Sequence, residues 1–357
     1  MAIKLLKEHI FFTKTLLDWN EKSNSREMPW KYEKDPYKIW LSEIILQQTR
    51  VEQGWDYYNR FVKKFPTVQK LASAKEAEVF KLWEGLGYYN RCKNLITTAK
   101  NIAQDLDGIF PNTYEGLLSL KGIGPYTAAA IASFAYNLPH AVVDGNVTRV
   151  LSRFFGIPTP IDSSSGKKEF PVLAQTLLDK KFPGIYNQSI MDFGATICKP
   201  KLPLCKNCMM SKNCVAFQEN KVNELPVKSK SIIVKERWFY YLVASYKDKT
   251  YIRKRVQQDI WQNLYEFILI EEDSFHFVED IIKSNKYKAI VSSKAELIKC
   301  SALCKQKLTH QTIHCIFIHL KLHQPLSMEG LELKDDKGMK KIAFPRLITN
   351  YFKVEIL

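Results

Sequence analysis

The chain has 357 residues, of which 46% are hydrophobic and 25% are charged, and its 53 Lys and Arg against 37 Asp and Glu give a net charge of +16. This length suffices for two or three domains, and the excess of positive charge favours nucleic acid as a partner. Eight cysteines are too few for a disulfide scaffold in a chain this long, and no apolar run reaches membrane-spanning length. We therefore expect a soluble protein of the reducing cytoplasm and no association with a membrane.

Residues 1 to about 217 have a helical pattern broken by glycine and proline. After an amphipathic N-terminal helix, a second helix should begin at Asp35 and Pro36, an N-cap residue followed by proline in the first turn. Further helices are expected over 49–65, 68–84, 90–106 and 113–120.

A glycine pair, Gly122 and Gly124, separates two helical stretches within residues 117–135. Two glycines permit a tight turn, and the N-terminus of the next helix can bind a phosphate through its free N–H groups. The turn could simply join two packed helices. Followed by the small residues Ala128, Ala129 and Ala130, it indicates a helix-hairpin-helix element that contacts the DNA backbone rather than the bases.

Asp144 follows an apolar stretch and precedes a helix that begins near Val147. Asp144 or Asn146 could serve only as the cap of this helix. A carboxylate close to a phosphate-binding hairpin could instead face a cation that develops when a glycosidic bond breaks. Both interpretations remain open from these residues alone.

Four cysteines lie close together at Cys198, Cys205, Cys208 and Cys214, with the spacing C-x6-C-x2-C-x5-C. Such clustering is not what packing alone produces, so we interpret it as a metal site. The uneven gaps argue against a structural zinc site, which usually has two tight cysteine pairs, and they suit a [4Fe–4S] cluster. Lysines within the same segment indicate that it also faces a polyanion.

Residues 218–236 are polar and rich in lysine, and we interpret them as a linker to a second domain. Beyond it, 237–246 and 250–255 suggest a β-hairpin, 264–270 and 310–322 are rich in β-forming residues, and 277–285 favours a helix. The second domain is therefore predicted to be α+β.

Together, the hairpin, its spacing to Asp144 and the cysteine segment resemble the endonuclease III superfamily of base-excision DNA glycosylases. Within it, the chain resembles the adenine DNA glycosylases of the MutY family over essentially its whole length. The matching motifs are PW at 29–30, SEIILQQTRV at 42–51, WEGLGYYNR at 83–91, VDGNVTRV at 143–150 and NQSIMDFGATIC at 187–198.

The resemblance implies a multidomain protein with an all-α helix-hairpin-helix core. Its expected parts are a six-helix subdomain at 30–136, an iron–sulfur subdomain formed by 1–29 and 137–217, and a Nudix-like lesion-recognition domain at 237–357. The implied substrate is double-stranded DNA in which adenine lies opposite 8-oxoguanine or guanine. The adenine would be flipped out of the stack by a nucleoid-associated monomer.

In this family the reaction needs one carboxylic acid and one carboxylate. By resemblance, Glu43 is the general acid and later the general base, and its apolar helix surround should raise its pKa. Asp144 would stabilise the sugar cation or form a transient adduct, Asn146 would orient the pair, and Tyr126 would donate a hydrogen bond near Asp144. Glu43 without this context would be interpreted as a surface residue.

The resemblance also implies contacts to DNA. Arg26, Trp30, Leu46 and Gln188 would line the adenine pocket. The residues expected to contact DNA or the lesion are Gln48, Thr49, Leu86, Tyr88, Lys121, Gly122, Gly124, Thr309 and His310.

Tyr126 also stands where strand-cutting relatives have a lysine that forms a Schiff base, so we expect a glycosylase without efficient lyase activity. The metal-binding helix of a Nudix box is absent from the second domain, which argues against a nucleotide-pool hydrolase. Two further functions compete with this interpretation, namely a glycosylase/lyase for oxidised pyrimidines and a non-catalytic iron–sulfur DNA-binding protein.

Overall fold

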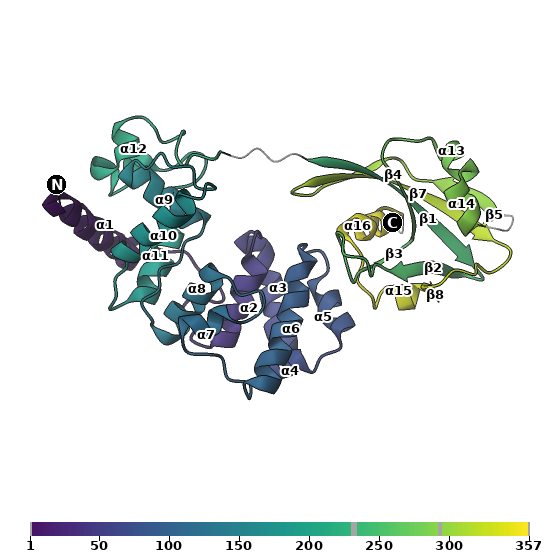
Figure 1. Cartoon of the computed structure of the whole chain (residues 1–357), viewed down its shortest axis with the longest axis horizontal. Coiled ribbons are helices and arrows are strands. Elements are labelled where there is room, and N and C mark those ends of the chain that lie inside the picture. Colours follow the sequence, from purple (N-terminus) through teal and green to yellow (C-terminus); the bar gives the residue numbers. More distant parts are fainter. Residues whose placement is uncertain (1, 230–233, 292–294, 356–357) are drawn as a thin grey trace. The chain divides into compact units, whose positions relative to one another are not determined.

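Helices account for most of the first 229 residues in the computed structural model, which describes residues 2–229, 234–291 and 295–355. Their bounds are α1 Ala2–Ser23, α2 Pro36–Leu46, α3 Val51–Lys64, α4 Val68–Ala72, α5 Glu76–Trp83, α6 Tyr89–Asp105, α7 Tyr114–Leu118, α8 Pro125–Tyr136, α9 Gly145–Phe155, α10 Gly166–Leu177, α11 Pro183–Thr196 and α12 Val215–Gln218 (Figure 1).

Local sequence signals explain several of these bounds. Helix α2 begins as predicted, because the Asp35 side chain accepts a hydrogen bond from the Tyr37 N–H at 2.9 Å and Pro36 occupies the first turn. The segment 68–84 is mostly helical as predicted, but it forms two helices, because α4 ends at Ala72 and α5 begins at Glu76. The Ser73 hydroxyl donates a hydrogen bond to the Lys70 carbonyl at the end of α4, so it competes with continuation of the helix.

The chain divides into two compact units, Met1–Ser73 with Asn94–Lys230 and Ala74–Lys93 with Ser231–Leu357. The predicted linker includes residues 230–233, which lie outside the described part of the chain. Residues 74–93 group with the C-terminal unit, whereas the sequence placed them in the six-helix subdomain. The division into subdomains otherwise stays a prediction.

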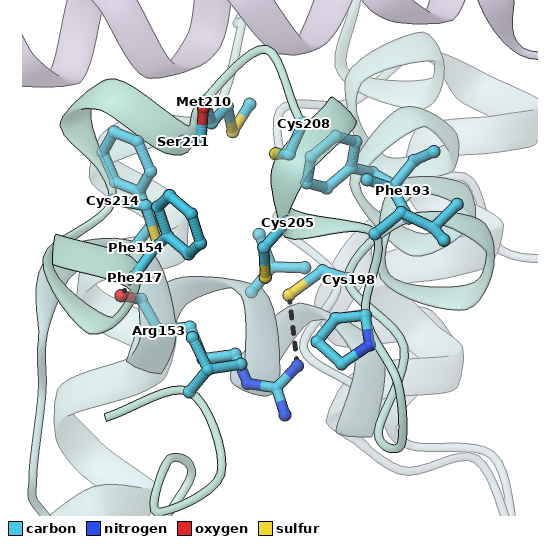
Figure 2. Close-up of a pocket in the computed structure, with 15 residues that line it drawn as sticks. Arg153, Phe154, Phe193, Cys198, Cys205, Cys208, Met210, Ser211, Cys214 and Phe217 are labelled. Atoms are coloured by element: carbon cyan, nitrogen blue, oxygen red, sulfur yellow. Dashed lines mark hydrogen bonds between the residues drawn. The ribbon is translucent and has the colours of Figure 1, made fainter. Parts of the chain in front are cut away.

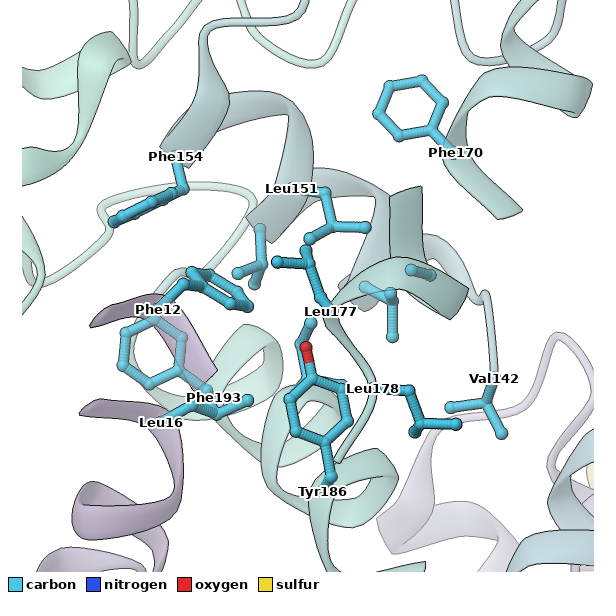
Figure 3. Close-up of a cluster of buried hydrophobic side chains, with 14 of the residues drawn as sticks. Phe12, Leu16, Val142, Leu151, Phe154, Phe170, Leu177, Leu178, Tyr186 and Phe193 are labelled. Atoms are coloured by element: carbon cyan, nitrogen blue, oxygen red, sulfur yellow. The ribbon is translucent and has the colours of Figure 1, made fainter. Parts of the chain in front are cut away.

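One hydrophobic cluster in the N-terminal unit packs α1, α9, α10 and α11 together (Figure 3). Phe12 of α1 contacts Phe154 of α9 with ring centroids 4.9 Å apart, and Trp19 meets Phe193 of α11 edge-on at 5.1 Å. Burial of such side chains stabilises each by about 1.5–3 kcal/mol relative to exposure. This core therefore fixes the position of α9, whose N-terminus carries Asp144.

The C-terminal unit contains a mixed sheet in which the long strands β1 and β7 pair in parallel (Figure 1). The strand order is β3-β2-β1-β7-β5, with β4 beside β1, β6 beside β7 and β8 beside β2. The bounds are β1 Lys235–Tyr246, β2 Lys249–Lys254, β3 Tyr265–Glu266, β4 Ile268–Glu272, β5 Ala295–Cys300, β6 Cys304–Lys307, β7 Gln311–Leu322, β8 Leu331–Lys334, α13 Val278–Lys283, α14 Asn285–Ile290, α15 Asp336–Met339 and α16 Arg346–Glu355. The predicted β-hairpin and the predicted α+β class are confirmed.

Candidate active site

Glu43 is a buried carboxyl group on α2, a helix most of whose residues are buried. Its side chain has a relative exposure of 5%, and Ser42, Ile44 and Ile45 beside it are buried as well. Burial raises the pKa of Glu43 to about 7, and the nearby negative charge of Asp144 adds to the effect. A carboxyl group with this pKa holds its proton at a pH at which an ordinary glutamate would have lost it.

Tyr126 of α8 lies between the two acids. Its hydroxyl donates a hydrogen bond to Glu43 and also lies 3.5 Å from Sδ of Met191. Burial, with the charges of Glu43 and Asp144, raises the pKa of Tyr126 far above its usual range, so the hydroxyl stays protonated. The structure thus brings Glu43, Tyr126 and Asp144 together from three separate helices or their ends.

Asp144 is the N-cap of α9, as one of the two sequence interpretations expected. Its Oδ1 accepts a hydrogen bond from the Val147 N–H and its Oδ2 accepts one from Nδ2 of Asn146, both at 2.7 Å. Burial raises the pKa of Asp144, whereas these donors and the charge of Arg149 oppose the rise. The donors at both oxygens of Asp144 favour its ionised form.

Asn146 is held from its other side by Arg149, which has a relative exposure of only 7%. The guanidinium donates to Oδ1 of Asn146 at 2.8 Å and to the carbonyls of Gly194 and Cys198 at 2.7 Å each. A side chain at Gly194 would meet Cβ of Asn146 at 2.7 Å, so only glycine allows this approach of α11 to α9. Asn146 is therefore fixed by packing as well as by hydrogen bonds.

Glu43 also lines a pocket in the same unit, together with Trp30 and Gln188. Trp30 is held edge-on against Tyr58, with ring centroids 5.2 Å apart. The other predicted pocket residues, Arg26 and Leu46, are not among the residues that line it. Lys31 is among them.

Asp192 organises one side of this pocket, although its own side chain is fully buried. It accepts hydrogen bonds from Nη1 of Arg26 at 2.8 Å and Nε2 of Gln188 at 2.9 Å, and Nζ of Lys31 lies 3.6 Å away. Sequence reasoning missed Asp192 and Arg149. Asp192 lies within the quoted motif at 187–198 and Arg149 within that at 143–150, and the presence of a charged residue inside each motif was the available signal.

The glycine hairpin joins α7 to α8 as predicted. Gly122 has a φ of +77°, and a Cβ there would lie 2.7 Å from Cβ of Asn94, whereas the space beside Gly124 is open. Gly124 is the N-cap of α8 and has no side-chain cap. Lys121 is exposed, and its carbonyl accepts a hydrogen bond from Thr98 at 2.5 Å. The open helix end beside Lys121 has the form of a phosphate site.

Replacing Gly122 by Ala should destabilise the protein by about 1–3 kcal/mol, because alanine would have to adopt a left-handed backbone and would clash with Asn94. Gly124→Ala is the matched control, since its backbone is not left-handed and nothing lies near the added methyl group. Urea unfolding of both variants measures the difference. Equal stability of the two variants would contradict this account of the hairpin.

The four cysteines line one cavity between α9, α11 and the segment that follows α11 (Figure 2). The aromatic rings of Phe154, Phe193 and Phe217 form its walls. Burial, with the charges of the other thiolates, raises the pKa of Cys208 to about 11, and the pKa values of Cys205 and Cys214 also rise. The thiols would therefore become thiolates only beside a compensating positive charge.

Arg153 holds the cysteine segment against α9. Its guanidinium donates to the Lys199 carbonyl at 2.8 Å and to the Leu225 carbonyl at 2.9 Å, and its Nη1 lies 3.5 Å from Sγ of Cys198. In the described residues, no group of three or more His, Cys, Asp or Glu side chains is arranged to hold a single metal ion. The four thiols around one cavity are the donor set that the described residues offer to a metal group.

The predicted lesion-reading residues lie in both units. In the N-terminal unit, Gln48 is exposed with a φ of +55° in the turn between α2 and α3, and Thr49 follows it. In the C-terminal unit, Leu86 is buried, and the Tyr88 hydroxyl lies 2.6 Å from Oγ1 of Thr309. Thr309 and the neighbouring His310 are exposed at the turn between β6 and β7.

The N-terminal unit therefore has the groups that cleavage of a glycosidic bond requires. Glu43 supplies a buried carboxyl group with a raised pKa, Asp144 supplies a second carboxyl group with hydrogen-bond donors at both oxygens, and the pocket at Glu43 has aromatic and amide walls. Two carboxyl groups whose environments separate their protonation states can act as acid and as cation stabiliser.

Comparisons with known proteins agree with this chemistry. Residues 41–172 match the family model described as the HhH-GPD superfamily base excision DNA repair protein. The chain is 33% identical over 311 residues to the adenine DNA glycosylase of Buchnera aphidicola subsp. Schizaphis graminum, covering 87% of this chain and 88% of that protein. It is 41% identical over 227 residues to the adenine DNA glycosylase of Rattus norvegicus, covering 60% of this chain and 44% of that protein.

Solved structures show the same core fold. A thermostable thymine-DNA glycosylase is similar with a TM-score of 0.56 and 30% identity, over 60% of this chain and 99% of that one. A trapped endonuclease III–DNA covalent intermediate is similar with a TM-score of 0.50 and 21% identity, over 58% of this chain and 96% of that one, and at this identity it shows the fold alone. No helix in the described residues is long and apolar enough to cross a membrane. With one-third identity along nearly the full length of a relative, the chain belongs to the adenine DNA glycosylase family.

Proposed function

We propose that this protein removes adenine from double-stranded DNA by hydrolysing its N-glycosidic bond, and that its preferred substrate has adenine opposite 8-oxoguanine or guanine. The observation that carries the proposal is the pair of acids. Glu43 keeps its proton near neutral pH, while Asp144 beside it is hydrogen-bonded at both oxygens. A base that leaves poorly as an anion needs such a proton donor, and the sugar left behind needs an anion.

In the first step, an extruded adenine enters the pocket lined by Trp30 and Gln188, and Glu43 donates its proton to N7 of the base. The hydrogen bond from Tyr126 to Glu43 orients the carboxyl group. Asp192 holds Gln188 and Arg26 in fixed rotamers, so Gln188 presents its amide to the base without reorganising.

In the second step, the C–N bond breaks and Asp144 stabilises the oxocarbenium-like sugar or bonds to it transiently. Asn146, held by Arg149, keeps the carboxylate of Asp144 aimed at the sugar. Glu43, now ionised, accepts a proton from water, which attacks the sugar and yields an abasic site with retained configuration. No lysine stands at position 126 to trap the sugar as a Schiff base, which supports a monofunctional reaction.

Cys198, Cys205, Cys208 and Cys214 would hold a [4Fe–4S] cluster. The cavity that all four thiols share supports this assignment. When bound, such a cluster would supply positive charge to the four thiolates and would cross-link the cysteine segment. Hydrolysis itself needs no electron transfer. Lys199, Lys206 and Lys212 would then present their charges to DNA phosphates. We expect the protein to act as a monomer on DNA in the cytoplasm, associated with the nucleoid.

The contact between Tyr88 and Thr309 supports recognition of the opposite base by the C-terminal unit. Because the hydrogen bond fixes the Thr309 hydroxyl, Thr309→Val should reduce the ratio of the rates for adenine opposite 8-oxoguanine and opposite guanine by about 2–10-fold. Tyr88→Phe removes the other partner of the same hydrogen bond. The double variant should therefore lose little more of the rate ratio than Thr309→Val alone. Single-turnover rates on the two duplexes give the ratio. An unchanged ratio in Thr309→Val would contradict the assignment.

The proposed activity is tested by incubating the protein with a duplex that has adenine opposite 8-oxoguanine and with an adenine–thymine control. Strand breaks that require alkali and occur only in the mispaired duplex support a monofunctional mismatch-specific glycosylase. Breaks without alkali would indicate a lyase, and no product from a brown, cluster-loaded preparation would contradict the proposal.

A further inference from the structure

A wide groove runs along α10 in the N-terminal unit, beginning next to the candidate active site. It has a volume of about 940 Å³. Tyr126 and Val143, the residue before Asp144, line one part of it, and Lys167 of α10 and Lys180, which follows α10, also line it. Although the chain has 37 Asp and Glu, none of them is among the described residues that line this groove. The groove therefore has basic and no acidic side chains in its described lining, and it reaches Tyr126 of the candidate site.

The walls of the groove are fixed in the protein. On one wall, the rings of Tyr114 and His140 stack with centroids 4.5 Å apart and an interplanar angle of 11°. On the other, Gln175 of α10 accepts a hydrogen bond from the Ala141 N–H at 3.0 Å and donates one to the Pro139 carbonyl at 2.8 Å. These two bonds tie α10 to the segment before Asp144, so the groove does not need to form on binding.

The positive charges of the groove are available to a ligand. Lys167 and Lys180 are exposed, and neither forms an ion pair within the described part of the chain. Lys167 lies in the first turn of α10 and Lys180 lies three residues beyond its last residue, and the helix of 12 residues between them is about 18 Å long. This distance corresponds to about five nucleotide steps along one DNA strand.

We propose that the groove along α10 binds the phosphate backbone of a flank of the substrate DNA, on the strand or strands adjacent to the extruded adenine, with Lys167 and Lys180 as phosphate contacts. The inference rests on the proposed function, since it takes DNA as the substrate. It assigns a backbone contact in addition to those proposed for the glycine hairpin at Lys121–Gly124 and for the lysines of the cysteine segment. The stacked pair Tyr114 and His140 gives the groove a rigid wall against which the sugar–phosphate chain can pack.

Three observations favour DNA over other occupants. The lining has basic and no acidic side chains, so it complements a polyanion. The groove opens next to Tyr126, where the proposed reaction places the extruded nucleotide. Its length suits several phosphates in series, whereas a small anion would need a compact set of donors.

The test compares Lys167→Ala/Lys180→Ala with Lys168→Ala/Lys181→Ala. The control pair removes the same charge from the neighbouring positions. Lys168 and Lys181 are also exposed, but they do not line the groove. Binding to a duplex with adenine opposite 8-oxoguanine is measured over a range of salt concentrations. The groove variant should bind about tenfold more weakly, and the slope of log K against log salt should fall by about 1.8, which is the loss of two phosphate contacts. The control should keep the wild-type slope.

Duplexes shortened on one side or the other then locate the flank. The wild type should lose affinity when the contacted flank is removed, and the groove variant should lose nothing further. Equal slopes for the groove and control variants, with both folded by thermal unfolding, would overturn the proposal. If the groove variant unfolds, Lys167→Gln and Lys180→Gln are measured singly, and each should lower the slope by about 0.9. Adenine release by the wild type is scored separately, so failure of the proposed function is distinguishable from failure of the groove.

Discussion

Glu43→Gln is expected to lower the single-turnover rate of adenine release by about 10²–10⁴-fold while changing duplex affinity only a few-fold. The amide of glutamine has nearly the same shape and can still accept the hydrogen bond from Tyr126, but it cannot donate an acidic proton. Rates at saturating enzyme, together with binding to an uncleaved duplex, separate the two effects. Glu52→Gln is the control, because Glu52 lies exposed in the first turn of α3.

The same substitution makes a prediction about stability. Burial raises the pKa of Glu43 from 4.5 to about 7. Between these two pH values the unfolded chain ionises Glu43 while the folded protein does not, so the wild type loses stability as pH rises and the loss is complete above about 7. Glu43→Gln should therefore exceed the wild type by about 3 kcal/mol at high pH and match it at low pH. A rate loss accompanied by lower stability at high pH would indicate misfolding rather than a missing proton.

Cys205→Ser is expected to abolish the brown colour, lower the melting temperature by roughly 10 °C or more and weaken DNA binding, all together. The four thiols line one cavity at the centre of the cysteine segment, so we expect the fold of the segment to depend on what they bind as well as on Arg153 and the buried Met210. Absorption spectra, thermal unfolding and DNA binding of the same preparation test this. Cys300→Ser is the matched control, since Cys300 is exposed on β5.

A colourless Cys205→Ser variant with wild-type stability and activity would contradict a structural role for the cysteine site. Loss of colour with normal stability but weak DNA binding would limit the role of the site to presenting lysines to the phosphates.

Much of the helical unit was predictable because its signals are local. Asp35 and Pro36 begin α2, and Gly122 permits the hairpin, through interactions within a few residues. The resemblance of whole motifs then identified Glu43 as a candidate, although a Glu on a helix is more often exposed and only the structure shows its burial.

The missed features depend on contacts between distant segments. Asp192 accepts a hydrogen bond from Arg26, which lies 166 positions away in the sequence. Tyr88 and Thr309 are hydrogen-bonded and lie 221 positions apart. Neither spacing leaves a periodic pattern. The groove along α10 was missed for the same reason, because its wall at Tyr114 and His140 comes from another part of the chain.

The most direct test of the central claim is the rate at which free adenine is released from a duplex with adenine opposite 8-oxoguanine, measured in single turnover from about pH 5 to about pH 9. If Glu43 is the acid, free adenine appears, and the rate is level at low pH and falls about tenfold per pH unit above a pKa near 7, because the ionised carboxyl has no proton to give. A rate that stays constant through this range, or a cluster-loaded protein that releases no adenine at any pH, would contradict the account.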